Sequence, residues 1–125
     1  MNLDEHKPPR EFTVGNKVLF PMHDCGRLAL EPDEQVTFTT ANGGELDVAR
    51  KDWGFYATPS LNGRLESFGL RGVLIRNAQT GRYFMLVVES GREKDFEAYL
   101  SQESCEIVHW LDTTEALEAL RKKIG

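Results

Sequence analysis

Residues 71–93 read RGVLIRNAQTGRYFMLVVESGRE, and this stretch decides the fold of the C-terminal half. It holds two nearly continuous apolar runs, 73–75 and 83–88, on the two sides of a turn that ends in Gly81. Strands that are apolar at every position are typical of sheets buried on both faces. The stretch therefore predicts two consecutive strands that both lie inside the molecule.

A helix and a third strand are predicted after this stretch. Ser90 and Glu93 have the Ser-x-x-Glu spacing of a capping box, and apolar residues then recur at helical intervals to about Glu103. Residues 105–111 return to a strand pattern. Because a strand, a helix and a strand in this order form a right-handed crossover, we expect the first and last of them to run parallel.

The sequence ends in a second predicted helix. Asp112-Thr113-Thr114-Glu115 supplies capping residues, and three apolar side chains that follow share one helix face. They are Leu117, Leu120 and Ile124. Residues 66–125 thus have the predicted order ββαβα.

The N-terminal half follows the two-residue period of strands. Residues 1–10 include Pro8 and Pro9 and predict an extended arm outside the core, because proline cannot donate to a ladder. Residues 11–20 alternate as a strand that can fold into a hairpin at Gly15-Asn16. We expect Pro21 to end this strand.

A second hairpin is centred on Asn42-Gly43-Gly44, where apolar residues alternate on both sides. After Val48 the alternation moves from even to odd positions, since the next large apolar residues are Trp53 and Phe55. Side chains of a strand alternate with period two, so this change requires a bulge or a break. We place the bend at Arg50-Lys51-Asp52.

The length of 125 residues is that of one ordinary domain. We expect a single α+β domain over 1–125, with the arm over 1–10, an antiparallel β-rich half over 11–65 and the ββαβα half over 66–125. The β-rich half is expected to form a small barrel-like or curled sheet. No apolar run approaches the roughly 20 residues that span a bilayer, so we expect a cytoplasmic protein without a membrane partner.

The strong metal-ligand candidates are two histidines and two cysteines, namely His23, Cys25, Cys105 and His109. On one strand, Cys105 and His109 would lie roughly 13 Å apart, at about 3.3 Å per residue, which is too far to share an ion. We therefore predict no metal site and no cofactor. We also expect free thiols, because a chain of this length needs no disulfide to fold.

The net charge of −5 is unevenly distributed along the chain. Residues 48–92 hold seven basic and three acidic side chains, and both flanking segments are acidic. Six of the seven are arginines, which bind carboxylate and phosphate in bidentate geometry. This segment indicates an anionic small molecule as ligand, and ion pairs with the acidic flanks are the alternative. An extended nucleic acid is not expected, because the whole molecule is negative and has no basic stripe or tail.

Cations and aromatic rings occur together around the predicted bend. Aromatic faces stack on bases or sugars, arginine and lysine bind anions, and amides orient hydroxyl groups. We therefore predict a concave site for an anionic small molecule such as a sugar or nucleotide-sugar. Its ligand-binding residues are Arg50, Lys51, Trp53, Tyr56, Asn62 and Arg64. The alternative is that Trp53 fills the core and the cations are solvated.

Two other functions remain open from the sequence. One is a homo-oligomeric protein-interaction subunit, a homodimer paired through an exposed strand edge with its arm across the partner. The other is a small metal-independent enzyme that uses a loop over 22–26. In that loop His23, Asp24 and Cys25 supply an imidazole, a carboxylate and a thiol. Known triads are assembled from distant residues, so the sequence favours a binding or accessory module over an enzyme.

Overall fold

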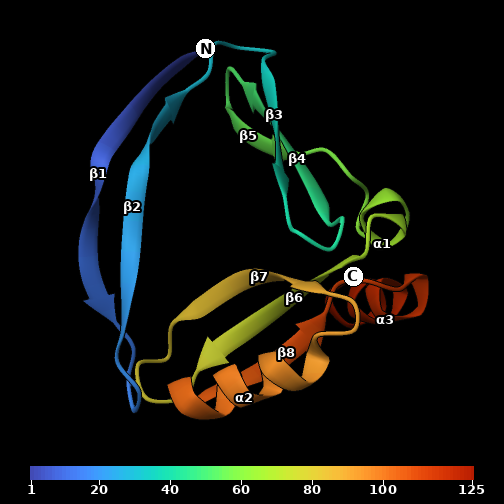
Figure 1. The fold of residues 1–125 in the computed structure, drawn as a ribbon. Helices are drawn as coiled ribbons and strands as arrows, with labels where there is room; N and C mark the ends of the chain where they lie inside the picture. The colour runs from blue at the N-terminus through green and yellow to red at the C-terminus, as the bar shows by residue number, and fades with distance from the viewer.

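A computed structural model describes all residues, 1–125, and divides eight strands among three antiparallel sheets (Figure 1). β1 and β2 form a hairpin, β3, β4 and β5 form a meander, and β6, β7 and β8 form a sheet with three helices around it. The strands are β1 (Asn2–Val14), β2 (Phe20–Ala29), β3 (Gln35–Thr39), β4 (Glu45–Lys51), β5 (Gly54–Ala57), β6 (Leu70–Asn77), β7 (Tyr83–Glu89) and β8 (Cys105–Trp110). The helices are α1 (Arg64–Ser67), α2 (Glu93–Glu103) and α3 (Thr114–Ile124). The predicted α+β class is confirmed, and the N-terminal strands form two open sheets rather than a closed barrel.

The C-terminal sheet carries the hydrophobic core. Its strand order is β7-β6-β8, and both outer strands are antiparallel to β6. β7 and β8 therefore run in the same direction, as predicted, although β6 separates them. Helix α2 lies against one face of this sheet (Figure 1). The buried cluster between helix and sheet consists of Val73, Ile75, Val88, Phe96 and Leu100.

The two long helices begin in different ways. At α3 the Thr113 hydroxyl accepts a hydrogen bond from the Ala116 N–H at 3.0 Å, which confirms the predicted cap. At α2 the predicted role of Ser90 is wrong, because Arg92 occupies the cap position and no side chain caps it. The chain turns at Gly91 (φ 92°), and this places its N–H 2.8 Å from the Glu93 carboxylate.

The hairpin of β1 and β2 corrects the predicted N-terminal arm. The turn at Gly15-Asn16 is confirmed, but residues 1–10 are not a free arm, because β1 includes almost all of them. Pro8 and Pro9 fall in a bulge where the register shifts between Glu5 and Arg10, so the ladder does not need their missing N–H groups.

Strand β2 also continues through Pro21 and through the stretch 22–26, which was predicted to be a loop. Each strand of a two-stranded sheet has one free edge, and a free edge tolerates proline. The predicted end at Pro21 and the predicted loop are therefore both wrong.

The meander confirms the second predicted hairpin, in which Val36 pairs with Val48 and Phe38 pairs with Leu46. The change of parity is also real, but it marks a second tight turn rather than a bulge. Lys51 pairs with Gly54, so the chain reverses through Asp52-Trp53 and β5 returns beside β4. The bend lies later than predicted, and Arg50 and Lys51 remain in β4.

The expectation that both C-terminal strands are buried on both faces holds only for the middle of β6. The first half of β7 is exposed, although Tyr83, Phe84 and Met85 are apolar or aromatic. The sequence pattern showed that this strand is apolar, but no other element of the chain covers its first half. The apolar face of α3 is likewise only partly covered, because Leu117 and Leu120 are half-buried and Ile124 is 80% exposed.

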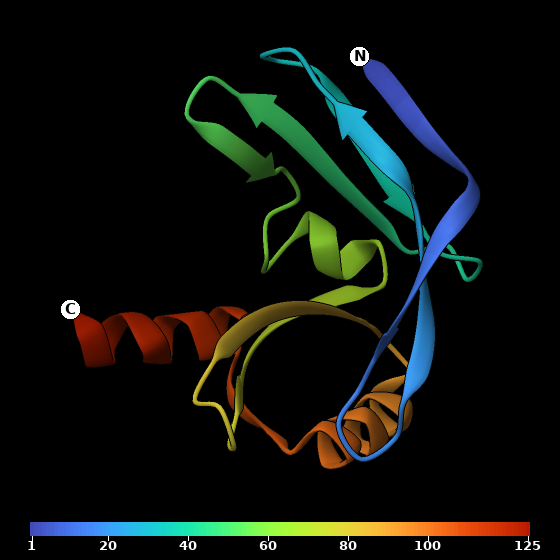
Figure 2. The same ribbon diagram turned by 90° about the vertical axis from the view of Figure 1, so that its left-hand side faces the viewer.

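The chain exposes more surface than a compact protein of its mass. Only 12 of 125 residues are buried, and the accessible surface is 8821 Å². A compact 14.2 kDa monomer exposes about 6,800 Å². The excess of about 2,000 Å² reflects the open arrangement of the three sheets, in which the hairpin arches along one side (Figure 2). None of the helices is long and apolar enough to cross a membrane.

Candidate interaction surface

The six residues predicted to bind an anion lie at the β4–β5 turn and on the segment that leads into α1. Arg50 and Lys51 end β4, Trp53 lies in the turn and Tyr56 is on β5. Because side chains alternate along a strand, Arg50 and Lys51 project from opposite faces of the sheet. None of the six lines any of the three cavities of the molecule.

Two of the predicted cations contact carboxylates of the same chain. The Lys51 ammonium lies 2.6 Å from Asp33, and this hydrogen bond is the main cause of a raised Lys51 pKa. The Arg64 guanidinium lies 3.1 Å from Asp47, a buried carboxylate that also accepts from the Thr37 hydroxyl. These contacts match the alternative of ion pairs with the acidic flanks.

The remaining two polar candidates differ in their contacts. The Asn62 amide donates to the Thr114 hydroxyl at 3.2 Å. Arg50 has no ion pair, but it shares its sheet face with Phe55, its cross-strand partner. The geometry therefore does not assemble the predicted concave site, and anion binding stays a prediction.

The proposed catalytic trio lies on β2 and does not converge. The Asp24 carboxylate contacts Arg10 at 3.3 Å and the Gly26 N–H at 3.2 Å. The Gly26 hydrogen bond is the main cause of a lowered Asp24 pKa. The neighbouring His23 projects from the opposite face and lies 3.7 Å from Glu11. The exposed Cys25 thiol donates to the His23 backbone carbonyl.

The four metal-ligand candidates are also separated. No three side chains of His, Cys, Asp or Glu gather in a geometry suited to a metal ion. His109 contacts the Ala116 carbonyl at 2.6 Å, which orients its ring toward α3. Burial raises the pKa of the Cys105 thiol, and the nearby Glu103 adds to this effect.

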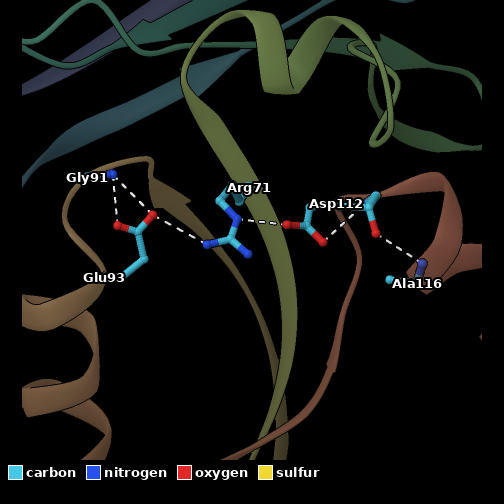
Figure 3. Close-up of polar contacts among 6 residues, drawn as sticks. Arg71, Gly91, Glu93, Asp112 and Ala116 are labelled. Carbon is cyan, nitrogen blue, oxygen red and sulfur yellow. Dashed lines mark hydrogen bonds and ion pairs between the residues drawn. The ribbon is translucent and has the colours of Figure 1, made fainter.

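A charged cluster that the sequence reading missed joins the starts of the two long helices (Figure 3). The Arg71 guanidinium donates to Asp112 at 2.7 Å and to Glu93 at 3.3 Å, and it stacks on the Trp110 ring at 3.9 Å. Asp112 is buried, and it also accepts from the Thr113 N–H. Every charge in the cluster has a partner, so this arrangement stabilises the C-terminal half rather than awaiting a ligand.

One cavity of about 230 Å³ lies where the hairpin tip meets the C-terminal sheet. Its lining includes Val14 and Phe20 of the hairpin, together with Phe84 and Tyr99 of the C-terminal half. Burial raises the pKa of the Tyr99 hydroxyl. Nearby, the Asn16 amide donates to Gln79 at 2.8 Å. We call this contact between the hairpin tip and the C-terminal sheet the seam, and it fixes the tip to the rest of the molecule.

One face of the hairpin is largely apolar and the other is polar. Cross-strand pairs share a face, and the apolar pairs of the first face are Leu3 with Leu28, Phe12 with Met22, and Val14 with Phe20; the Arg10–Asp24 ion pair lies between the first two of them. We call these six apolar side chains the hairpin face. Its first four members are exposed, so no layer of the chain covers the hairpin between its tip and its base.

The meander has a second apolar face, formed by Val36, Phe38, Leu46, Val48 and Phe55, of which Val36, Leu46 and Val48 are half-buried. We call these five side chains the meander face. Phe38 is 56% exposed and Phe55 is 69% exposed. Beside them, at the β4–β5 turn, Trp53 is 73% exposed.

No protein-family model, curated protein or solved structure matches this chain.

Proposed function

We propose that this protein is a protein-interaction subunit that works as a pair of identical chains. The excess of about 2,000 Å² over a compact monomer carries this proposal. Obligate homodimers bury about 2,000–5,000 Å² in total, counting both chains. If each of two chains covers its excess, the total of about 4,000 Å² falls within that range.

A second copy is the partner that best fits the two faces. Each chain carries a projecting apolar hairpin and an uncovered apolar meander, so two copies related by a two-fold axis can cover both elements reciprocally. A different protein would have to supply a complement to each of them. Homo-oligomers with two-fold symmetry are also the commonest soluble assemblies.

The composition of the β4–β5 hairpin supports a protein contact rather than an anion site. Trp53, Phe55, Tyr56 and Arg50 lie on or beside this hairpin, and the three aromatic side chains are exposed. Tryptophan, tyrosine and arginine are enriched among the residues that contribute most to protein interfaces. In the proposed pair, these four side chains of the segment predicted to bind an anion contact protein instead.

The test is the mass of the protein in solution, measured by sedimentation velocity over a wide range of concentrations. We expect the wild type to sediment as twice its 14.2 kDa mass. The double variant Phe38→Glu with Phe55→Glu places two charges on the meander face and should sediment as a monomer. Gln35→Glu, on the polar face of β3, is the matched control and should remain a dimer. A wild type that is monomeric at every concentration would refute the proposal.

A further inference from the structure

The hairpin is held to its own chain at its two ends. At its base it is continuous with the meander through residues 30–34, and the Met1 amino group contacts Glu34 at 2.8 Å. At its tip it has the seam with the C-terminal sheet and the Asn16–Gln79 hydrogen bond. No hydrogen bond or ion pair joins the rest of the hairpin to another element. Its middle spans the space beside the meander as an arch (Figure 1).

An amphipathic hairpin of this kind needs a cover. An isolated two-stranded hairpin is marginally stable in water, and antiparallel sheets with alternating faces normally pack the apolar face on a core. The polar face carries pairs such as Asp4 with Arg27 and Glu11 with His23, so it suits solvent. Apart from Val14 and Phe20 at the tip, the hairpin face has no covering layer within the chain.

The meander face is the matching surface. On its opposite face Asp47 is buried against Arg64 of α1, whereas Gln35, Thr37 and Thr39 are polar and exposed. The meander face is continuous at one end with a cavity of about 150 Å³, where Phe38 and Leu46 approach Leu70 and Val87. It is therefore an apolar sheet surface with one open side, of the kind that packs against a second sheet in a sandwich.

We infer that the β1–β2 hairpin of each copy lies across the meander face of the other copy. This inference rests on the proposed pairing of two chains and names the surfaces that make it. In this arrangement the hairpin of each chain covers the meander face of the other. The same hairpin–meander contact thus occurs twice, as a two-fold axis requires. The sheets would then pack about 10 Å apart, with the hairpin and meander side chains interdigitated.

Photo-crosslinking of the full chain tests this arrangement. Phe12, in the middle of the hairpin face, is replaced by the photoreactive analogue p-benzoylphenylalanine, which keeps an aromatic ring at this position. We expect illumination to give a covalent dimer whose cross-link joins position 12 of one chain to β3, β4 or β5 of the other. The same probe at Thr13, the neighbouring residue on the polar face, is the matched control and should give no covalent dimer.

A second variant tests the receiving surface. Phe38→Glu, combined with the probe at position 12, should abolish the covalent dimer, whereas Gln35→Glu with the same probe should retain it. Circular dichroism of each variant checks that the strands still form, so that a lost cross-link reports a lost contact.

Each other outcome overturns the inference in a distinguishable way. A cross-link confined to one chain would mean that the hairpin closes on its own meander. A covalent dimer joined elsewhere, or a dimer by sedimentation without any cross-link from position 12, would leave the pairing of two chains standing but place it on other surfaces. A chain that is monomeric by sedimentation would refute both the inference and the proposed function.

Discussion

Arg71 has a larger structural role than any other single charge of the chain. Its guanidinium contacts Asp112 and Glu93, so it connects β6 with the starts of α2 and α3 (Figure 3). It also stacks on the Trp110 ring. Asp112 is buried, and its carboxylate has no other cationic partner. A buried charge without its partner is strongly unfavourable.

We therefore predict that Arg71→Leu lowers the free energy of unfolding by about 3 kcal/mol, the lower end of the range for breaking a buried pair. Urea unfolding followed by circular dichroism measures this change. The control is Arg76→Leu, which removes a partly exposed pair with Glu106 on the same strand. It should cost about 1 kcal/mol or less. Equal losses in the two variants would contradict the role assigned to Arg71.

Glu93 gives this cluster a dependence on pH. Hydrogen bonds from the backbone, first the Gly91 N–H and then its own, and the nearby Arg71 hold the Glu93 pKa below its ordinary value. The folded state thus binds this proton more weakly than the unfolded state. The stabilisation is fully present above the unfolded pKa of about 4.3 and is lost as the pH falls through the folded pKa.

We predict that wild-type stability decreases more steeply below about pH 4.3 than the stability of Glu93→Gln, which cannot titrate at this position. Thermal unfolding at a series of pH values between 3 and 7 compares the two proteins. Glu97→Gln, at an exposed position of α2 without a hydrogen bond or ion pair, is the control and should follow the wild type. Parallel curves for wild type and Glu93→Gln would exclude this contribution.

At the scale of elements, the hairpin depends on close approach of its two strands at Gly26. Gly26 has φ 148°, and a Cβ atom built there would lie 2.4 Å from the Asp4 carbonyl oxygen. Gly26→Ala should therefore separate the outer ends of β1 and β2, with a strain of about 1–3 kcal/mol or more. Hydrogen exchange of the amides of residues 2–5 should become faster.

The matched control is Gly43→Ala in the β3–β4 turn. Gly43 also has a positive φ, of 90°, but a Cβ atom there would meet nothing within 4 Å. Gly43→Ala introduces backbone strain without a steric clash, and it does so outside the β1–β2 hairpin. Hydrogen exchange of residues 2–5 should therefore be unchanged in this control. Unchanged exchange in Gly26→Ala as well would show that the hairpin accommodates a Cβ atom at this position without separating its strands.

The elements also show what periodicity can and cannot predict. The β3–β4 hairpin and the cap of α3 followed from the sequence because turn and cap residues act locally, as Gly43 and Thr113 do. The order ββαβα was predictable for the same reason. Strand β2 through Pro21 was not, because a proline breaks a strand only if its N–H is needed, and that depends on where the partner strand lies.

The candidate surface was visible in the sequence, and the anionic ligand predicted for it stays a prediction. The basic and aromatic segment predicted a special site, and Trp53 and Tyr56 are indeed exposed together on the β4–β5 hairpin. Which cations remain free depends on tertiary pairs, and neither Lys51 with Asp33 nor Arg64 with Asp47 has a regular sequence spacing. The homodimer was an alternative from the sequence. It is now the better proposal because the exposed apolar area that supports it can be measured only on the folded chain.

At the scale of the whole molecule, stability is divided unequally between the two halves. The buried cluster belongs to the C-terminal sheet and α2, whereas the hairpin and the meander contribute no residue to it. A two-stranded hairpin is marginally stable on its own. In the proposed pair the second chain supplies the stability that the hairpin lacks.

This division predicts that thermal stability depends on protein concentration. When a dimer unfolds to two separate chains, each tenfold rise in concentration should raise Tm by about 3 °C for a pair of this size, from the usual unfolding enthalpy per residue. Circular dichroism melts at three concentrations, each spaced tenfold, measure the shift for the wild type. The double variant Phe38→Glu with Phe55→Glu should melt at one temperature throughout, because its chains are already separate. A wild-type Tm that is equally independent of concentration would mean that the exposed faces stabilise no pair, and the excess surface would then need another partner.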